Sequence, residues 1–253
     1  MAREPKTCIF CRGNGLTDEH VVPDWLKQLI PKNERTGNLF ILTDHGAGRQ
    51  SRQVRQGSPI TRQVHFVCGR CNTGWMSTLE DELKPTLANL VLGKTITLSE
   101  WQRRRLSTWA VKTAMTSEYI HPPTVAIPFD MREHLRLHRQ PHERFDVWIG
   151  FYNGKGRLLG SEHHSGEFSE PGTEPTGVPN TQATTIGLGQ IFFQIAYCGV
   201  PQARFHLKNE KISKMRRIWP PTEGEMMWPP FLVLDADDIT IILRGIHEAF
   251  EDK

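Results

Sequence analysis

Two CxxC pairs constrain this chain more than any other feature. Cys8 and Cys11 form the first pair, and Cys68 and Cys71 form the second. A CxxC turn directs two sulfur atoms at one point, so two such turns can supply the four thiolates of a tetrahedral zinc site. A redox CxxC or a chance pairing is the alternative. Together the two pairs predict bound Zn²⁺ with a structural role, because four sulfur ligands leave no open coordination position.

The remaining composition is that of an ordinary soluble chain. Of its 253 residues, 38% are hydrophobic and 23% are charged, and the length allows one or two domains. No apolar run approaches the roughly 18 residues of a membrane span, and the first ten residues do not resemble a secretory signal. We therefore expect a cytoplasmic location without membrane contact, where stable disulfides are rare. The fifth cysteine, Cys198, lies in an apolar run and is expected to be a buried side chain.

Residues capable of chemistry flank each cysteine pair. Glu19 and His20 open the run EHVVP after the first pair, and Asn72 directly follows the second. Read alone, these could be a surface acid beside a strand histidine and a helix N-cap. The order of EHVVP, a strand, CxxCN and a helix resembles the HNH endonucleases in their zinc-knuckle form. The resemblance covers residues 6–90 and implies a ββα-metal, treble-clef-like nuclease module.

The resemblance also implies hydrolysis of phosphodiester bonds. His20 would be the general base that activates water, which suits the near-neutral pKa of an unperturbed imidazole. Glu19 and Asn72 would hold a divalent cation, and their oxygen atoms suit Mg²⁺ or Mn²⁺. The middle residue of the family pattern is usually Asn, and none precedes the second cysteine pair here. Gln63 could fill that amide role, and His65 is an alternative ligand.

The segment between the cysteine pairs is rich in arginine. Residues 35–70 contain six Arg, one acidic residue and no Lys, a net charge of 6 − 1 = +5, against +3 for the whole chain. Arginine binds phosphate with two parallel hydrogen bonds and can contact base edges. The alternative is a solvated, partly disordered loop. We predict contact with DNA, RNA not being excluded, through Arg49, Arg52, Arg55, Arg62 and Arg70.

The rest of the chain predicts an α+β fold with a mainly antiparallel sheet. Pro85 is expected to kink or end the first of the expected helices, and residues 161–180 are expected to form a mobile loop because of their polar, Gly- and Pro-rich composition. Periodicity predicts helices at 73–92, 99–119 and 130–139 and strands at 145–152 and 184–197.

These patterns suggest two domains. Residues 1–95 would form the HNH-like module, with an Arg/Gln-rich insertion at 33–62. Residues 96–253 would form an α+β domain for target recognition, sensing or dimerisation, since a two-fold dimer is the simplest way to cut two strands.

The leading hypothesis is a metal-dependent endonuclease acting on DNA, in a setting such as restriction or phage defence. The first alternative is a non-catalytic zinc-knuckle protein that binds nucleic acid. The second is a protein-interaction module in which zinc only stabilises the fold.

Overall fold

The computed structural model describes residues 6–30, 62–169, 172–174, 176–200, 203 and 210–251, together with the backbone of strands at 35–36, 39–46 and 49–56. Among these residues, no helix is both long and apolar enough to cross a membrane. The fold combines helices with mainly antiparallel sheets, which confirms the α+β class.

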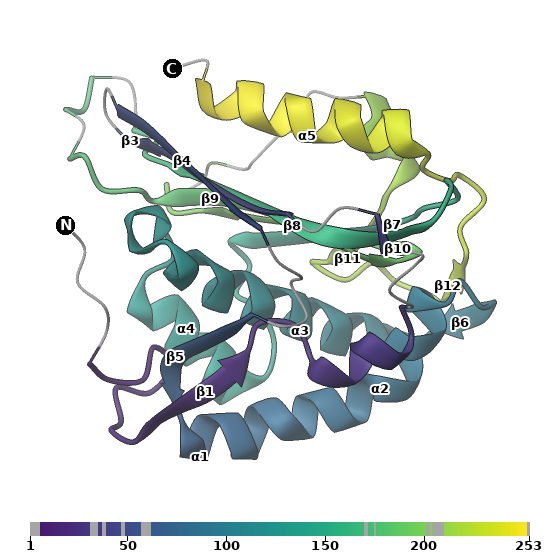
Figure 1. Ribbon diagram of the computed structural model, residues 1–253, viewed down its shortest axis with the longest axis horizontal. Coiled ribbons are helices and arrows are strands. Elements are labelled where there is room, and N and C mark those ends of the chain that lie inside the picture. Colours follow the sequence, from purple (N-terminus) through teal and green to yellow (C-terminus); the bar gives the residue numbers. More distant parts are fainter. Residues whose placement is uncertain are drawn as a thin grey trace.

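An eight-stranded sheet forms the centre of the molecule (Figure 1). Its strand order is β11-β7-β10-β9-β8-β3-β4, and β2 also pairs with β8. The pairings are antiparallel, except that β2 and β3 run parallel to β8. The strands are β2 (Arg35–Thr36), β3 (Leu39–Gly46), β4 (Arg49–Gln56), β7 (Phe145–Phe151), β8 (Arg157–Gly166), β9 (Thr181–Gly189), β10 (Ile191–Cys198) and β11 (Arg216–Trp219).

Helices cover both faces of this sheet, with α5 on one side and α2, α3 and α4 on the other (Figure 1). Every residue of β9 and β10 is buried, as expected for strands covered on both faces. At the turn between them, a Cβ on Gly189 would lie 2.3 Å from the Val91 carbonyl oxygen, so only glycine fits. The helices are α2 (Ser77–Val91), α3 (Glu100–Ser117), α4 (Phe129–His138) and α5 (Ala236–Glu251).

The predicted helices are present, with sharper boundaries. Ser99 caps α3 in a reciprocal capping box with Gln102, which fixes its first residue. Pro85 lies inside α2 and does not end it, because the helix continues to Val91.

The N-terminal region forms a smaller unit of two antiparallel strands followed by a helix. Strand β1 (Leu16–His20) pairs with β5 (Gln63–Cys68), and the chain then enters α1 (Gly69–Cys71), a π-helical turn (Asn72–Met76) and α2. A further small sheet pairs β6 (Ile96–Leu98) with β12 (Met226–Trp228). Short 3₁₀ helices complete the structure: η1 (Asp24–Gln28), η5 (Glu118–Ile120), η6 (Pro122–Thr124) and η7 (Glu210–Lys214).

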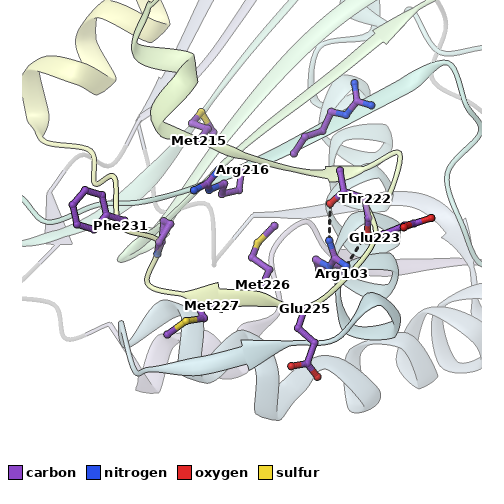
Figure 2. Close-up of a pocket in the computed structure, with 11 residues that line it drawn as sticks. Arg103, Met215, Arg216, Thr222, Glu223, Glu225, Met226, Met227 and Phe231 are labelled. Carbon is purple, nitrogen blue, oxygen red and sulfur yellow. Dashed lines mark hydrogen bonds between the residues drawn. The ribbon is translucent and has the colours of Figure 1, made fainter.

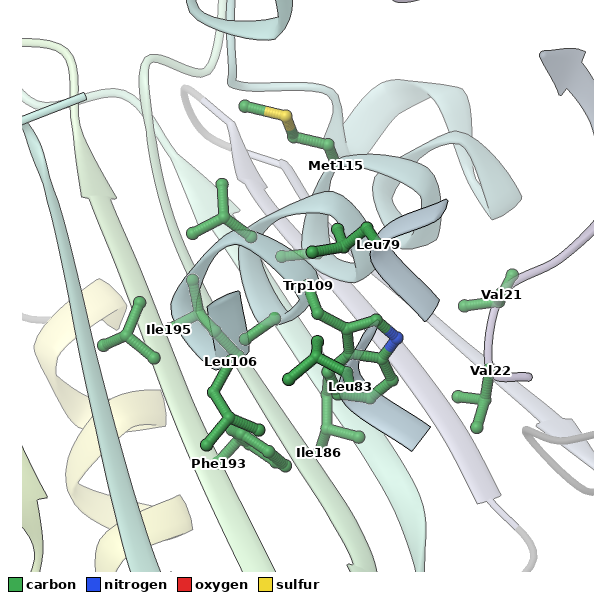
Figure 3. Close-up of a cluster of buried hydrophobic side chains, with 14 of the residues drawn as sticks. Val21, Val22, Leu79, Leu83, Leu106, Trp109, Met115, Ile186, Phe193 and Ile195 are labelled. Atoms are coloured by element: carbon green, nitrogen blue, oxygen red, sulfur yellow. The ribbon is translucent and has the colours of Figure 1, made fainter. Parts of the chain in front are cut away.

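The larger of two apolar clusters joins the two parts of the chain. Figure 3 shows Trp109 of α3 among side chains from the segment after β1, from α2 and from the sheet. The ring centroids of Trp109 and Phe193 lie 5.5 Å apart. This core therefore contains residues from both sides of position 95.

The loop expected at 161–180 is wrong for residues 161–166, which belong to β8. Two of their buried polar side chains have partners on the neighbouring strand β9. Ser161 Oγ donates to the Thr185 carbonyl at 3.0 Å, and His163 Nδ1 lies 2.7 Å from Thr184 Oγ1. Burial lowers the pKa of His163 to about 3, so this imidazole is neutral in the sheet. Polar composition misled the prediction because polar side chains such as Ser161 and His163 are buried in the strand and bonded to β9.

Candidate metal centre and neighbouring pocket

The four cysteines of the CxxC pairs converge on one point. Their sulfur atoms all lie within 4.8 Å of one another, and the Cys11 and Cys68 sulfurs are 3.5 Å apart. All four are free thiols, and only Cys11 is partly exposed. Four soft sulfur donors at this separation fit a structural metal such as zinc. The predicted cysteine cluster is therefore confirmed as a group that can hold such an ion.

Tight backbone turns hold the first pair. The Cys8 N–H donates to the Gly13 carbonyl at 2.9 Å, and the Arg12 N–H donates to the Cys8 carbonyl at 2.8 Å. The Gly13 N–H points at Cys11 Sγ from 3.4 Å. A Cβ at Gly13 would lie only 3.2 Å from that sulfur, so glycine allows this close approach.

The strand pairing brings the second pair to the first. Leu16 of β1 is opposite Cys68 of β5, and the Gly69 N–H donates to the Gly15 carbonyl at 2.9 Å. Close packing of the sulfurs also shifts their acidity. The pKa of Cys8 is lowered to about 4, chiefly by a hydrogen bond from the Cys71 thiol, whose own pKa is raised. The hydrogen bond thus favours the thiolate at Cys8, the form that binds metals.

A pocket of about 280 Å³ lies beside the cluster, where β1 meets the start of α2. Three residues predicted from the sequence, Glu19, His20 and Asn72, all line it. Carboxylates that the sequence analysis did not single out also contribute. The full lining consists of Asp18, Glu19, His20, Pro23, Asp24, Trp25, Asn72, Met76, Ser77 and Glu80.

His20 stands at the end of β1 with 32% of its side chain exposed. Its Nε2 lies 3.3 Å from Gln63 Nε2 and 3.6 Å from Asp24 Oδ1, and Asp24 also pairs with Lys27. A neighbouring carboxylate orients an imidazole ring. The structure therefore brings Gln63 next to His20, opposite it on β5.

His65 does not itself line the pocket, but it contacts the lining residue Asp18. Its Nδ1 is 3.0 Å from Asp18 Oδ1, and the two side chains are 61% and 67% exposed. Two arginines of the predicted nucleic-acid contact are also described: Arg62 is half-buried, and Arg70 is exposed, with Nη2 3.9 Å from Cys11 Sγ. The side chains of Arg49, Arg52 and Arg55 lie outside the described residues.

Asn72 connects the helical segment to β1. Its Nδ2 donates to Thr17 Oγ1 at 3.2 Å and to the Asp18 carbonyl at 3.1 Å. The N-cap interpretation does not describe these contacts, since both acceptors belong to the strand. Neither bond uses the amide oxygen Oδ1, the atom that the predicted metal-binding role requires.

Glu19 forms an ion pair with Lys112, a residue not singled out from the sequence. It is 7% exposed, and its Oε1 lies 3.3 Å from Nζ of Lys112, a fully buried lysine on α3. The same Nζ lies 3.0 Å from Glu80 Oε1. Burial raises the pKa of Glu19, against the attraction of Lys112. Burial alone would lower the pKa of Lys112, but attraction to Glu80 and Glu19 outweighs it and raises that pKa.

The one sequence signal for Lys112 was its position. It interrupts the run of uncharged residues that follows Arg105 in a helix whose later residues are all buried. A lysine there needs a buried partner. The partners come from β1 and α2, which no local pattern indicates.

Chemically, the arrangement combines a closed sulfur cluster with an open pocket lined by an imidazole, an amide and several carboxylates. The sulfur cluster can hold a structural metal. The pocket contains oxygen donors and an imidazole base that face the same cavity. Comparisons of the chain with protein-family models, with curated proteins and with solved structures find no match.

Proposed function

We propose that this protein is a metal-dependent endonuclease of the HNH type that hydrolyses phosphodiester bonds in DNA. One observation carries the proposal: Glu19, His20 and Asn72, to which the resemblance to HNH endonucleases assigns the catalytic roles, line a single pocket beside the four-cysteine cluster. Restriction or phage defence is the proposed setting, and a two-fold dimer is the proposed form for cutting both strands.

Each residue has a role in this proposal. His20, half-exposed at the pocket, accepts the proton of the attacking water, and Gln63 and Asp24 hold its ring. The Glu19 carboxylate and Asn72 Oδ1 would hold a divalent cation such as Mg²⁺ or Mn²⁺. That cation supplies charge stabilisation to the phosphate and to the leaving oxygen. The sulfur cluster, loaded with zinc, fixes β1, β5 and the helix start that present these groups.

A second candidate is a non-catalytic zinc-knuckle protein that binds nucleic acid. One contact favours it: the ion pair between Lys112 and Glu19 occupies an oxygen of the proposed metal ligand. In that case the zinc-stabilised fold and its arginines contact phosphates, and no hydrolysis follows.

Plasmid nicking separates the two candidates. Wild-type protein, supercoiled plasmid and Mg²⁺ or Mn²⁺ should give nicked product, and His20→Ala should lower the rate by about 10²- to 10⁴-fold. His138→Ala, which removes an exposed histidine of α4 outside the pocket lining, is the matched control and should cleave like wild type.

Three results would change this proposal. Equal nicking by wild type and His20→Ala would remove His20 from the mechanism. An inert wild type that still binds DNA would favour the non-catalytic candidate. Cleavage of single-stranded RNA in place of plasmid would keep the chemistry and change the substrate.

A further inference from the structure

We propose that Lys112 is a positioning residue of this pocket: it binds Glu19 and Glu80 from the protein interior and holds their carboxylates at the pocket wall. This inference rests on the proposed function and adds a residue from outside the region that resembles HNH nucleases. It also means that residues 1–95 do not contain the whole site.

The first support is the junction at the ammonium group. Lys112 comes from α3, Glu19 from β1 and Glu80 from α2, and a single Nζ lies 3.3 Å and 3.0 Å from the two carboxylate oxygens. Burying a charged group costs several kcal/mol unless it is well paired. An apolar side chain of similar length would fill the same space without that cost, so packing alone does not explain a lysine here.

The second support is the order of burial. The side chain of Lys112 is fully buried, that of Glu19 is 9% exposed and that of Glu80 is 23% exposed. Both carboxylates line the pocket and Lys112 does not. The ammonium therefore lies behind the carboxylates as seen from the pocket. A buried group that holds a metal-binding side chain in one orientation lowers the entropic cost of ordering that side chain when the metal binds.

A second buried cation on the same helix shows that this placement is specific. Arg103 is 1% exposed and also belongs to α3. Its guanidinium donates to Thr222 Oγ1 and to the Thr222 carbonyl, both at 2.9 Å (Figure 2). It also donates to the Gly224 carbonyl. Arg103 thus binds neutral acceptors between β11 and β12, beside a separate cavity of about 510 Å³. Of the two buried cations, only Lys112 contacts residues of the candidate pocket.

The test must separate position from charge. Lys112→Met alone would change the summed charge of Lys112, Glu19 and Glu80 from −1 to −2 and would itself attract a cation. Lys112→Met/Glu80→Gln keeps the sum at −1 but removes the ammonium that holds Glu19. Glu80→Gln alone, whose summed charge is +1 − 1 = 0, retains the Lys112–Glu19 pair and is the reference. The double variant is one charge more negative than this reference, so charge alone would tighten its binding of a cation, and weaker binding reports the loss of position. Arg103→Met controls for the loss of a buried cation from α3.

The measurements are the dissociation constant for Mn²⁺, followed by electron paramagnetic resonance on the zinc-loaded full chain, and plasmid nicking as a function of Mn²⁺ concentration. The double variant should bind Mn²⁺ about 10- to 100-fold more weakly than Glu80→Gln. Its nicking rate should fall most at low Mn²⁺ and recover in part at high Mn²⁺. Arg103→Met should match wild type in Mn²⁺ affinity, whatever its loss of stability.

Several results would overturn the inference. A folded, zinc-loaded double variant that binds Mn²⁺ as tightly as Glu80→Gln would do so while leaving the proposed function intact, provided that wild type nicks plasmid. If the double variant does not fold, a crystal structure of Mn²⁺-loaded wild type decides: Lys112 Nζ detached from Glu19 would reject the role. Wild type that neither binds Mn²⁺ nor nicks plasmid would reject the proposed function and this inference with it.

Discussion

The cysteine cluster and the adjacent pocket share one frame of β1, β5 and the following helix, but their side chains are held in different ways. The cluster uses four identical donor atoms, fixed by tight backbone turns and one strand pairing. The pocket uses several kinds of group, fixed by side-chain hydrogen bonds and by a buried lysine from α3. The cluster should therefore respond to changes in its own turns, and the pocket to changes far along the chain.

The largest effect is expected from removing a cluster sulfur. Cys68→Ser should lose bound zinc and unfold the region around β1 and β5, because a structural zinc site contributes on the order of 10 kcal/mol. Zinc content and hydrogen exchange of these strands measure this. Cys198→Ser, which removes a buried thiol of β10 outside the cluster, should keep its zinc. A well-folded, zinc-free Cys68→Ser protein would show that the cluster is not structural.

The next largest effect is expected at Asn72, which lies between the cysteine cluster and the pocket. Asn72→Ala retains Cys71 but removes two hydrogen bonds to β1 and an amide of the pocket. We expect full zinc content, a loss of about 1–3 kcal/mol of stability, and plasmid nicking lowered about 100-fold. Thr73→Ala, a neighbouring exposed position that bonds within the helical segment, is the control. Unchanged nicking by Asn72→Ala would mean that Asn72 only connects the helical segment to β1 and has no part in catalysis.

A smaller change should affect the cluster alone. Gly13→Ala places a Cβ 3.2 Å from Cys11 Sγ, so a local shift is needed, at a cost of about 1 kcal/mol. Zinc affinity in competition with a chelator should fall, and nicking at full zinc loading should not change. Gly69→Ala, whose Cβ would make an ordinary 3.5 Å contact with Thr17 Cγ2, should bind zinc normally. Reduced nicking by zinc-saturated Gly13→Ala would mean that the regions are not separable.

The smallest effect is expected at the exposed pair of His65 and Asp18. Solvent screens this pair, so His65→Ala should change stability by at most about 1 kcal/mol, measured by urea denaturation. Nicking should also remain at the wild-type level. A large loss of nicking would restore His65 as the metal ligand that the sequence allowed, and would move the proposed site toward β5.

Local spacing explains what the sequence could predict. Two CxxC turns define both halves of the cluster, and a glutamate, a histidine and an asparagine adjoining them are carried into one pocket by the pairing of β1 with β5. The helix expected from residue 99 is likewise set by a local signal, because Ser99 caps the first turn of α3.

Contacts between distant segments explain what the sequence did not predict. Lys112 is 93 residues from Glu19 along the chain, and only the packing of α3 behind β1 joins them. The end of β8 was mistaken for a loop because its hydrogen-bond partners lie on β9. The pairing of β3 with β8 is likewise set by tertiary structure, since parallel strands are not joined by a short turn.

The pairing of β3 with β8 has a consequence for how the metal and the sheet depend on each other. Cys11 and Cys68 are 57 residues apart, and between them the chain adds β3 and β4 to the edge of the central sheet before returning. An ion bound by both cysteine pairs would close the loop between them, and the entropic cost of closing a loop rises with the length of its free chain. Pairing of β3 with β8 shortens the free part of this loop. Metal binding and strand pairing therefore each lower the entropic cost of the other. Metal loading and the attachment of the sheet edge are therefore thermodynamically linked, and a chelator should loosen strands that do not contact the ion.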